Sequence, residues 1–227
     1  MGIIERREDI EAGRLDAFVD GAFAFTLTLL VIGGDAVPDS TATLLQMLGG
    51  IPAFAVCFWL IAFFWHGHVR WRRRCRQADG AGLWLSLLLV FFALIFVYPL
   101  HMLFASVFNT FSGGRLPSAF ELRGPAEIRT LFICYGIAFA CMAGTLALLF
   151  RHAARRALAE GGSPSEAQLE TLMWSVPASL GVLSALVAGM LPLTAPAWCW
   201  TVPGFLYVLM FLLGPLGAGF RRRHGMA

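Results

Sequence analysis

Two carboxylates, Asp16 and Asp20, stand in an otherwise apolar segment near the start of the chain. They are one helical turn apart, and no other charged residue follows them before Ile32. A carboxylate inside a membrane-spanning segment costs about 3 kcal/mol on insertion scales, so it is by default functional or paired. Asp16 lies near enough to the expected interface to snorkel to water, whereas Asp20 needs a partner or a functional role.

The candidate partners of Asp20 are Trp65 and His68, which end the second apolar segment at about the same depth. Their ring N–H groups can donate to a carboxylate, so we expect a hydrogen-bonded cluster of Asp20, Trp65 and His68. Arg14 stands at the edge of the first segment and is placed to compensate the charge of Asp20.

The first segment also has an apolar face opposite Asp16 and Asp20, with Thr28 beside it. At about 100° per residue, its members are Phe18, Gly21, Phe25, Leu29 and Ile32. From periodicity alone, such a face packs in a core or against lipid.

Nothing else in the sequence indicates catalysis or metal binding. The chain has no glycine-rich phosphate loop, no catalytic triad and no carboxylate pair beside a base. His66 and His68 are two residues apart and point to different helix faces, so they do not share a metal ion. The five cysteines lack metal-ligand spacing. We therefore expect neither an enzyme nor a bound cofactor.

The composition favours lipid as the solvent of most of the chain. Of 227 residues, 58% are hydrophobic and 14% are charged, and the mean hydropathy is +0.72, which leaves too little charge to cover a soluble domain. We predict an all-α membrane protein with a single domain over residues 1–227 and about six spans of roughly 20 residues each. The predicted segments are Leu15–Ile32, Leu44–Trp65, Leu83–Phe108, Arg129–Phe150, Leu172–Leu191 and Trp198–Phe220.

Arginine sets the predicted orientation, because the chain has no lysine. Arginines cluster before the first segment and after the second, fourth and sixth, whereas the alternate loops hold few. By the positive-inside rule, both termini are then cytoplasmic. The basic run 70–76 could also bind nucleic acid, but beside a hydrophobic span contact with lipid headgroups explains it better.

Short motifs along the first 100 residues resemble a known family. Arg14, Phe18 and Asp20 open the first segment, Trp65 and His68 end the second, and a Leu-Trp-Leu-Ser-Leu run opens the third. In order and spacing these resemble the transmembrane protein 175 family, potassium channels of endosomes and lysosomes with single-repeat relatives in bacteria. That family has a serine where this chain has Val19 and an asparagine where it has Ser86.

The resemblance implies six helices per chain, a homotetramer, and a central pore that the first helix lines. It implies rings of apolar side chains in that pore in place of a carbonyl filter, which here would be Phe25, Leu29 and Ile32. Phe25 stands where family members tend to carry isoleucine or leucine, and Thr28 offers a weak selectivity contact. The permeant ion would be K⁺, and the location a bacterial plasma membrane.

Two other functions stay open. A secondary transporter would show broken helices near the membrane midplane, and prolines at 177, 203 and 215 interrupt the last two segments. A non-conducting membrane scaffold would follow if Val19 and Phe25 have closed the pore. Flux that saturates and couples to a second solute would indicate a transporter, and ohmic single-channel steps a channel.

Overall fold

The structure is a computed structural model that describes residues 3–32, 39–75, 79–118, 120 and 122–212. Of residues 3–12, 31–32 and 211–212 it describes the backbone alone. Within these ranges the chain is helical and has no strand, which confirms the predicted all-α class. The elements are α1 (Ile3–Ile32), α2 (Thr41–Gly49), α3 (Ile51–Arg74), α4 (Gly80–Phe111), α5 (Pro125–Ala159), α6 (Ser165–Met190), the 3₁₀ helix η1 (Ala197–Thr201), α7 (Val202–Phe205) and the 3₁₀ helix η2 (Leu206–Leu212).

Within the described part of the chain, four helices, α3 to α6, are long and apolar enough to cross a membrane. The shortest of them, α3, has 24 residues, and a span needs roughly 20. The helices α4, α5 and α6 contain almost the whole of the predicted third, fourth and fifth segments and extend beyond them mainly at their polar ends.

The predicted second segment, Leu44–Trp65, forms two helices instead of one. Helix α2 ends at Gly49, and α3 begins at Ile51 with Pro52 in its first turn. Proline has no N–H for the interior of a helix but is favoured at its first positions, so the chain restarts here. Because α2 has 9 residues and is only about 13 Å long, α3 alone can cross a bilayer.

The predicted sixth segment, Trp198–Phe220, is a series of short elements over its described part. The elements η1, α7 and η2 follow one another up to Leu212, and Pro203 stands in the first turn of α7. Residues 213–220 of this prediction lie outside the described residues.

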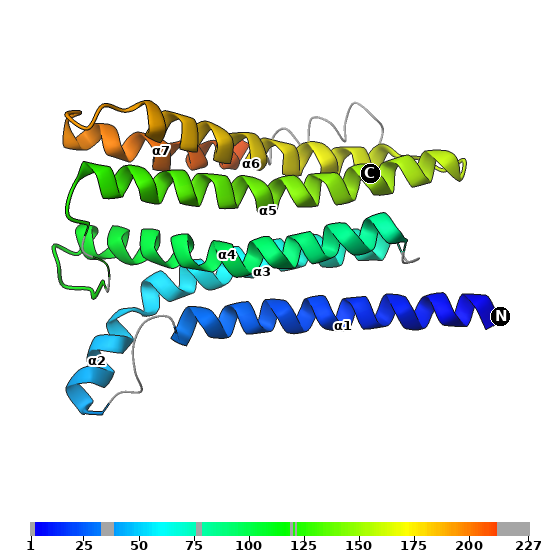
Figure 1. The fold of residues 1–227 in the computed structure, drawn as a ribbon, viewed down its shortest axis with the longest axis horizontal. Coiled ribbons are helices and arrows are strands. Elements are labelled where there is room, and N and C mark those ends of the chain that lie inside the picture. Colours follow the sequence, from blue (N-terminus) through cyan, green and yellow to red (C-terminus); the bar gives the residue numbers. More distant parts are fainter. Residues whose placement is uncertain (1–2, 33–38, 76–78, 119, 121, 213–227) are drawn as a thin grey trace.

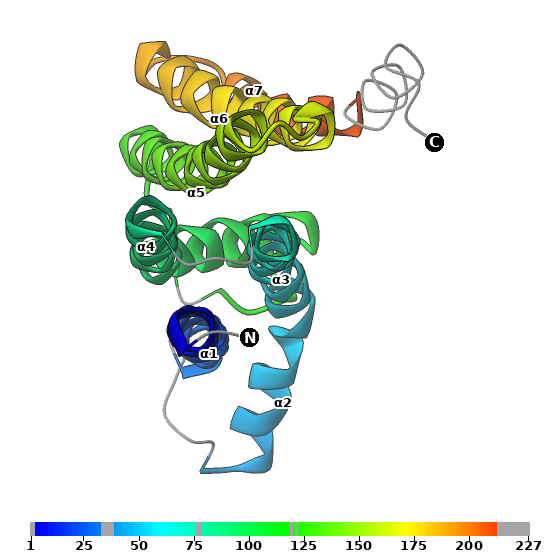
Figure 2. The same cartoon turned by 90° about the vertical axis from the view of Figure 1, so that its right-hand side faces the viewer.

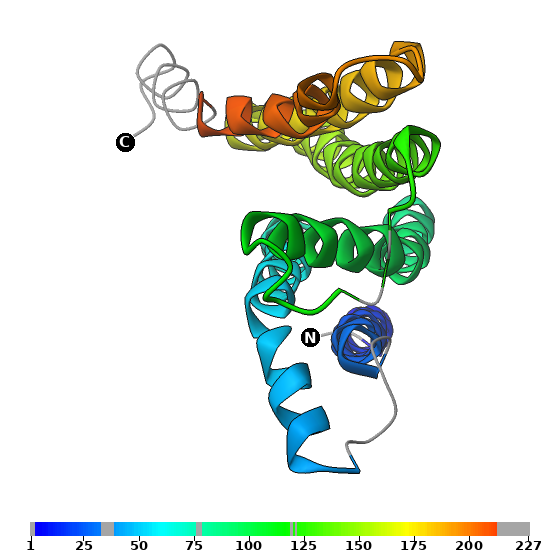
Figure 3. The ribbon, with the colours of Figure 1, turned by 90° about the vertical axis from the view of Figure 1, so that its left-hand side faces the viewer.

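The long helices run side by side along the long axis of the molecule (Figure 1). Seen along that axis, α1 lies next to α3 and α4, α5 follows, and α6 with α7 forms the last layer (Figures 2 and 3). Helix α2 turns away from the bundle at one end. The other end, which we call the basic end, holds the start of α1, the end of α3 and the end of α5 (Figure 1). The last turns of α3 and α5 carry seven arginines there: Arg70, Arg72, Arg73, Arg74, Arg151, Arg155 and Arg156.

Aromatic rings join the four apolar helices at the centre of the bundle. Phe64 of α3 is fully buried, and its ring lies 5.9 Å from Phe96 of α4, 5.5 Å from Phe139 of α5 and 5.7 Å from Trp174 of α6. Edge-to-face and tilted pairs at such distances add to the stabilisation that burial gives. This cluster fixes the lateral positions of α3 to α6.

Helices α5 and α6 meet through their backbones. A Cβ atom added at Gly136 would lie 2.7 Å from the carbonyl oxygen of Gly181, and one added at Gly181 would lie 2.7 Å from that of Gly136. Small residues at a crossing point let two membrane helices approach this closely. The two helices therefore form a tight pair.

Candidate functional site

Helix α1 presents two unlike faces to the rest of the chain. One face is buried against the neighbouring helices and consists of Leu15, Val19, Phe23, Thr26 and Leu30. The other is the apolar face predicted from periodicity, and the described residues of the chain leave it largely uncovered. There Phe18 and Phe25 are 55% and 57% exposed, Gly21 and Thr28 are exposed, and Leu29 is half-buried.

Thr28 lies beside this face, and Ile32 lies at its end. The hydroxyl of Thr28 donates to the carbonyl oxygen of Phe25 at 2.7 Å, within its own helix. Ile32 is the last residue of α1, and the structure describes its backbone but not its side chain. The structure thus places Phe18, Phe25 and Leu29 along one side of α1.

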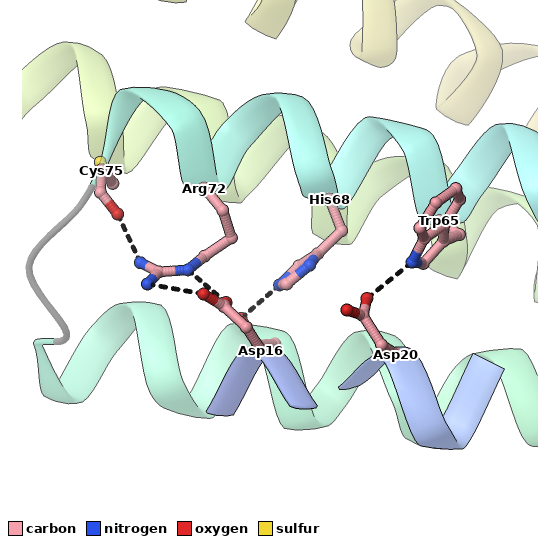
Figure 4. Close-up of polar contacts among 7 residues, drawn as sticks. Asp16, Asp20, Trp65, His68, Arg72 and Cys75 are labelled. Carbon is pink, nitrogen blue, oxygen red and sulfur yellow. Dashed lines mark hydrogen bonds and ion pairs between the residues drawn. The ribbon is translucent and has the colours of Figure 1, made fainter. Parts of the chain in front are cut away.

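The indole of Trp65 bridges α3 and α1. Its Nε1 donates to Oδ1 of Asp20 at 2.7 Å (Figure 4). Trp65 and Asp20 are 45 residues apart in the sequence. The contact gives the Asp20 carboxylate, which lies in the apolar part of α1, a hydrogen-bond donor. Both side chains are exposed within the single chain, and a hydrogen bond to a charged group contributes about 1.5–3 kcal/mol.

His68 has a different partner from the one that the sequence suggests. Its Nε2 lies 3.0 Å from the hydroxyl oxygen of Ser86 in α4, and the residue is 2% exposed. The expected hydrogen bond between His68 and Asp20 is therefore a wrong prediction. Trp65 and His68 lie three residues apart on α3, and Trp65 contacts α1 while His68 contacts α4.

Asp16, expected to reach water, instead forms an ion pair with Arg72. Nε of Arg72 lies 2.5 Å from Oδ1 of Asp16, and its second terminal nitrogen lies 3.2 Å from Oδ2. The first terminal nitrogen of Arg72 donates to the carbonyl oxygen of Cys75 (Figure 4). This fork geometry binds a carboxylate through two hydrogen bonds. Sequence reasoning missed it, although Arg72 stands two turns beyond Trp65 on the helix that Asp20 contacts.

Together, the two carboxylates attach α1 to α3 at two successive turns. Rotation of α1 about its axis would break both contacts, so the uncovered face with Phe25 keeps its direction. Arg14 is exposed and forms no ion pair with Asp20 among the described residues. The structure thus brings Asp20 and Trp65 together and leaves Arg14 and His68 outside that pair.

A second polar group lies at the basic end around Asp79. This carboxylate caps α4 by accepting from the backbone N–H of Gly82 at 2.9 Å, and it contacts Nε2 of His152 at 2.5 Å and Arg156 at 3.5 Å. Burial acts to raise the pKa of Asp79, but the Gly82 N–H, His152 and Arg156 outweigh it and hold the pKa below its ordinary value. Asp79 thus anchors the start of α4 to the end of α5.

A third group joins α3 to α6. Glu170 of α6 is 6% exposed and pairs with Arg70, while Arg74 pairs with Glu166 at 3.2 Å and lies 3.9 Å from Glu170. A buried carboxylate with two arginines leaves no uncompensated charge. These ion pairs hold the basic end together and carry no sign of catalysis.

Long apolar helices with arginines gathered at one end define an integral membrane protein of the helical class. Residues 14–99 match the model of the family described as the endosomal/lysosomal potassium channel TMEM175. The resemblance indicated by the motifs is therefore confirmed for this part of the chain. The matched residues contain Asp16, Asp20, Trp65, His68 and Arg72, so the contacts between α1 and α3 lie inside the matched region.

Known proteins are similar to this chain in sequence and in fold. A protein of Marivirga tractuosa named "Potassium channel" is 31% identical over 90 residues, which span 40% of this chain and 36% of that relative. A crystal structure of a variant of the potassium channel MtTMEM175, bound to a nanobody–MBP fusion, has a TM-score of 0.76 at 21% identity and covers 94% of both chains. A crystal structure of a lysosomal potassium-selective channel TMEM175 homolog from Chamaesiphon minutus has a TM-score of 0.61 at 20% identity. The match covers 91% of this chain and 98% of the chain in that structure. These two structures establish the shared fold.

Proposed function

We propose that this protein is a subunit of a potassium-permeable cation channel whose pore α1 lines. The observation that carries the proposal is the uncovered face of α1, where Phe18 and Phe25 are more than half exposed although the opposite face is buried. A central pore formed by several copies would cover this face, which the chain's own core leaves open, and the family match over residues 14–99 favours this position over contact with lipid. The matched family and the relative named "Potassium channel" support the choice of ion.

The pore would be closed by apolar side chains. Phe25, Leu29 and Ile32 follow one another at spacings of four and three residues, so copies of them would form stacked rings. An apolar constriction stops ions by dewetting, because a cation stripped of its water there meets a large desolvation penalty. Thr28 places its hydroxyl beside this path and is the proposed selectivity contact.

The membrane topology follows from the same parts. Helices α3 to α6 supply four spans, and α1 and the segment from Ala197 onward supply the first and the last. The basic end then faces the cytoplasm, with both termini on that side. A homotetramer in a bacterial plasma membrane is the assembly we propose, with lipids and further copies of the chain as its partners.

The two contacts between α1 and α3 would set the direction of the pore face. Because Asp20 accepts from Trp65 and Asp16 pairs with Arg72, the rotation of α1 is fixed by its own subunit. Bringing Phe25 to the pore axis then requires no conformational change on assembly.

Recordings in planar bilayers test the proposal. The purified protein and a Phe25→Ala variant would be measured with potassium on one side and sodium on the other. We expect low basal conductance in the native protein and discrete ohmic steps in the variant, with a reversal potential displaced towards that of potassium. Silence of both proteins, with tetramers intact in the same preparation, would reject a channel.

A secondary transporter is the other candidate, favoured by the broken last segment. The elements η1, α7 and η2 replace one continuous helix between Ala197 and Leu212, and interrupted helices line the binding sites of many transporters. Liposome flux that saturates and depends on a second solute would favour this function over a channel.

A further inference from the structure

One stripe of α5 is only partly covered by the other described helices. Its exposed or half-buried residues recur every three or four positions: Cys134, Ile137, Cys141, Gly144, Leu148, Arg151 and Arg155. Ile137 and Leu148 are 52% and 47% exposed. The stripe is apolar from Cys134 to Leu148 and ends in two arginines at the basic end.

These two arginines differ from their neighbours in having no acidic partner within the described part of the chain. On the adjacent face of the same helix, His152 and Arg156 contact Asp79. Arg151 and Arg155 are exposed and stand four residues apart, so their like charges repel across one turn. An anion bound between them would remove this repulsion.

We propose that Arg151 and Arg155 bind the phosphate of an anionic phospholipid whose acyl chain lies along the apolar stripe of α5. The proposal requires that α5 spans the bilayer, and it does not depend on ion conduction. Guanidinium groups bind phosphate through paired N–H donors, and anionic headgroups attract basic residues at the cytoplasmic surface.

The dimensions of the stripe fit one lipid leaflet. From Leu148 back to Ile137, α5 rises about 16 Å, close to half of the roughly 30 Å hydrocarbon core. Gly144 lowers the surface between them, since a Cβ atom added there would meet only the Cβ of Ala178, at 4.0 Å. An acyl chain lying here would contact Leu148 first and then pass over Gly144.

Binding of defined lipids to the purified full-length protein tests the site. Native mass spectrometry would compare phosphatidylglycerol with phosphatidylcholine of the same chains, for the parent and for Arg151→Gln/Arg155→Gln. At about fivefold per arginine, the double variant should bind phosphatidylglycerol roughly 25-fold more weakly, with phosphatidylcholine unchanged. The control is Arg115→Gln, an exposed arginine at the other end of the bundle, which should have no effect. Equal losses for both lipids, or for the control, would overturn the proposal.

Two further arms separate the lipid from other occupants. Inorganic phosphate should not displace phosphatidylglycerol at equal concentration, and Gly144→Leu should weaken binding of the long-chain lipid at unchanged thermal stability. Displacement by phosphate, or unchanged affinity in Gly144→Leu, would contradict a lipid site on this stripe. A smaller oligomer in light scattering of the double variant, with lipid binding retained, would assign the stripe to a contact between copies instead.

Discussion

Trp65 donates its indole N–H to Asp20 across 2.7 Å and so joins the first apolar helix to the third. His68, one turn further along the same helix, turns to Ser86 of α4. Two residues of one short motif therefore serve two different interfaces. Trp65 attaches α1, which carries the uncovered face, to α3. His68 attaches α3 to α4.

The contact between Trp65 and Asp20 predicts a coupled pair of substitutions. Asp20→Ala and Trp65→Phe should each destabilise the protein, and their effects should differ from additivity by about 1–3 kcal/mol. Thermal or denaturant unfolding of the two single variants and the double variant measures this coupling. The cross pair Asp20→Ala with Ser86→Ala should add to within about 0.5 kcal/mol. Strict additivity of Asp20 and Trp65 would mean that the two side chains do not meet.

The ion pair of Asp16 and Arg72 predicts that charge can be exchanged between the helices. Arg72→Gln should cost about 1 kcal/mol, below the value for fully buried pairs, because the Asp16 side chain is 40% exposed. The swap Asp16→Arg with Arg72→Asp should recover part of this loss. Arg73→Gln, at the exposed neighbouring position, should change stability by no more than about 0.5 kcal/mol. A swap less stable than either single variant would argue against the pair.

Phe25 and Phe23 offer a matched test of the two faces of α1. Phe25→Ala, on the uncovered face, should raise potassium flux into liposomes and leave monomer stability nearly unchanged. Phe23 lies on the buried face and is 3% exposed, so Phe23→Ala should lower the free energy of unfolding by about 3–5 kcal/mol without opening a path. Flux and thermal stability are measured on the same preparations. A folded, tetrameric Phe25→Ala protein that conducts no more than the parent would remove Phe25 from the constriction.

The proposed orientation predicts which positions are accessible from outside. In a cysteine-free background, Asp39→Cys and Thr194→Cys should react with an impermeant thiol reagent added to intact cells. Arg155→Cys, at the basic end, should react only after the membrane is opened. All three positions are surface positions, so accessibility reports the side of the membrane. Labelling of Arg155→Cys in sealed cells would reverse the topology.

Asp79 predicts a loss of stability in acid. Its pKa is lower in the folded chain than its ordinary value of 3.8, so the carboxylate stabilises the fold at pH values above about 3.8. This contribution disappears as the pH falls through the lower, folded-state pKa. Unfolding midpoints from pH 6 to pH 3 should fall less steeply for Asp79→Asn, which keeps the helix cap. Parallel curves for parent and variant would show that the charge of Asp79 adds no stability.

The sequence predicts which segments are apolar helices better than it predicts where one helix ends and the next begins. Long runs without charged residues indicate α3 to α6. A segment in lipid must satisfy its own backbone hydrogen bonds, so such a run is expected to be helical. The division at Gly50 and Pro52 escaped this reasoning, although a proline in the first turn is a signal for a new helix. In the last segment, Pro203 likewise stands in the first turn of α7, but a single proline does not distinguish a kinked helix from short 3₁₀ elements.

The polar contacts show a similar division. The sequence indicates that Asp20 needs a partner, and depth along the two segments selects Trp65. It does not select between Asp20 and Ser86 for His68, because that choice depends on the rotation of α3 about its axis. The pair of Asp16 and Arg72 depends in addition on the reach of a long side chain. Rotation and reach are set by packing, which residue spacing alone does not fix.

The backbone contact between α5 and α6 limits where the molecule can change shape. A Cβ atom added at Gly136 or Gly181 would collide with the carbonyl oxygen of the facing glycine, so the close approach of the two helices leaves little room for sliding or turning. Helices α5 and α6 therefore form one rigid unit. On the other side of the bundle, α1 packs through side chains alone, with its buried apolar face and the polar contacts of Asp16 and Asp20 against α3. A change in the shape of the bundle would therefore meet less backbone collision at the boundary of α1 than between α5 and α6.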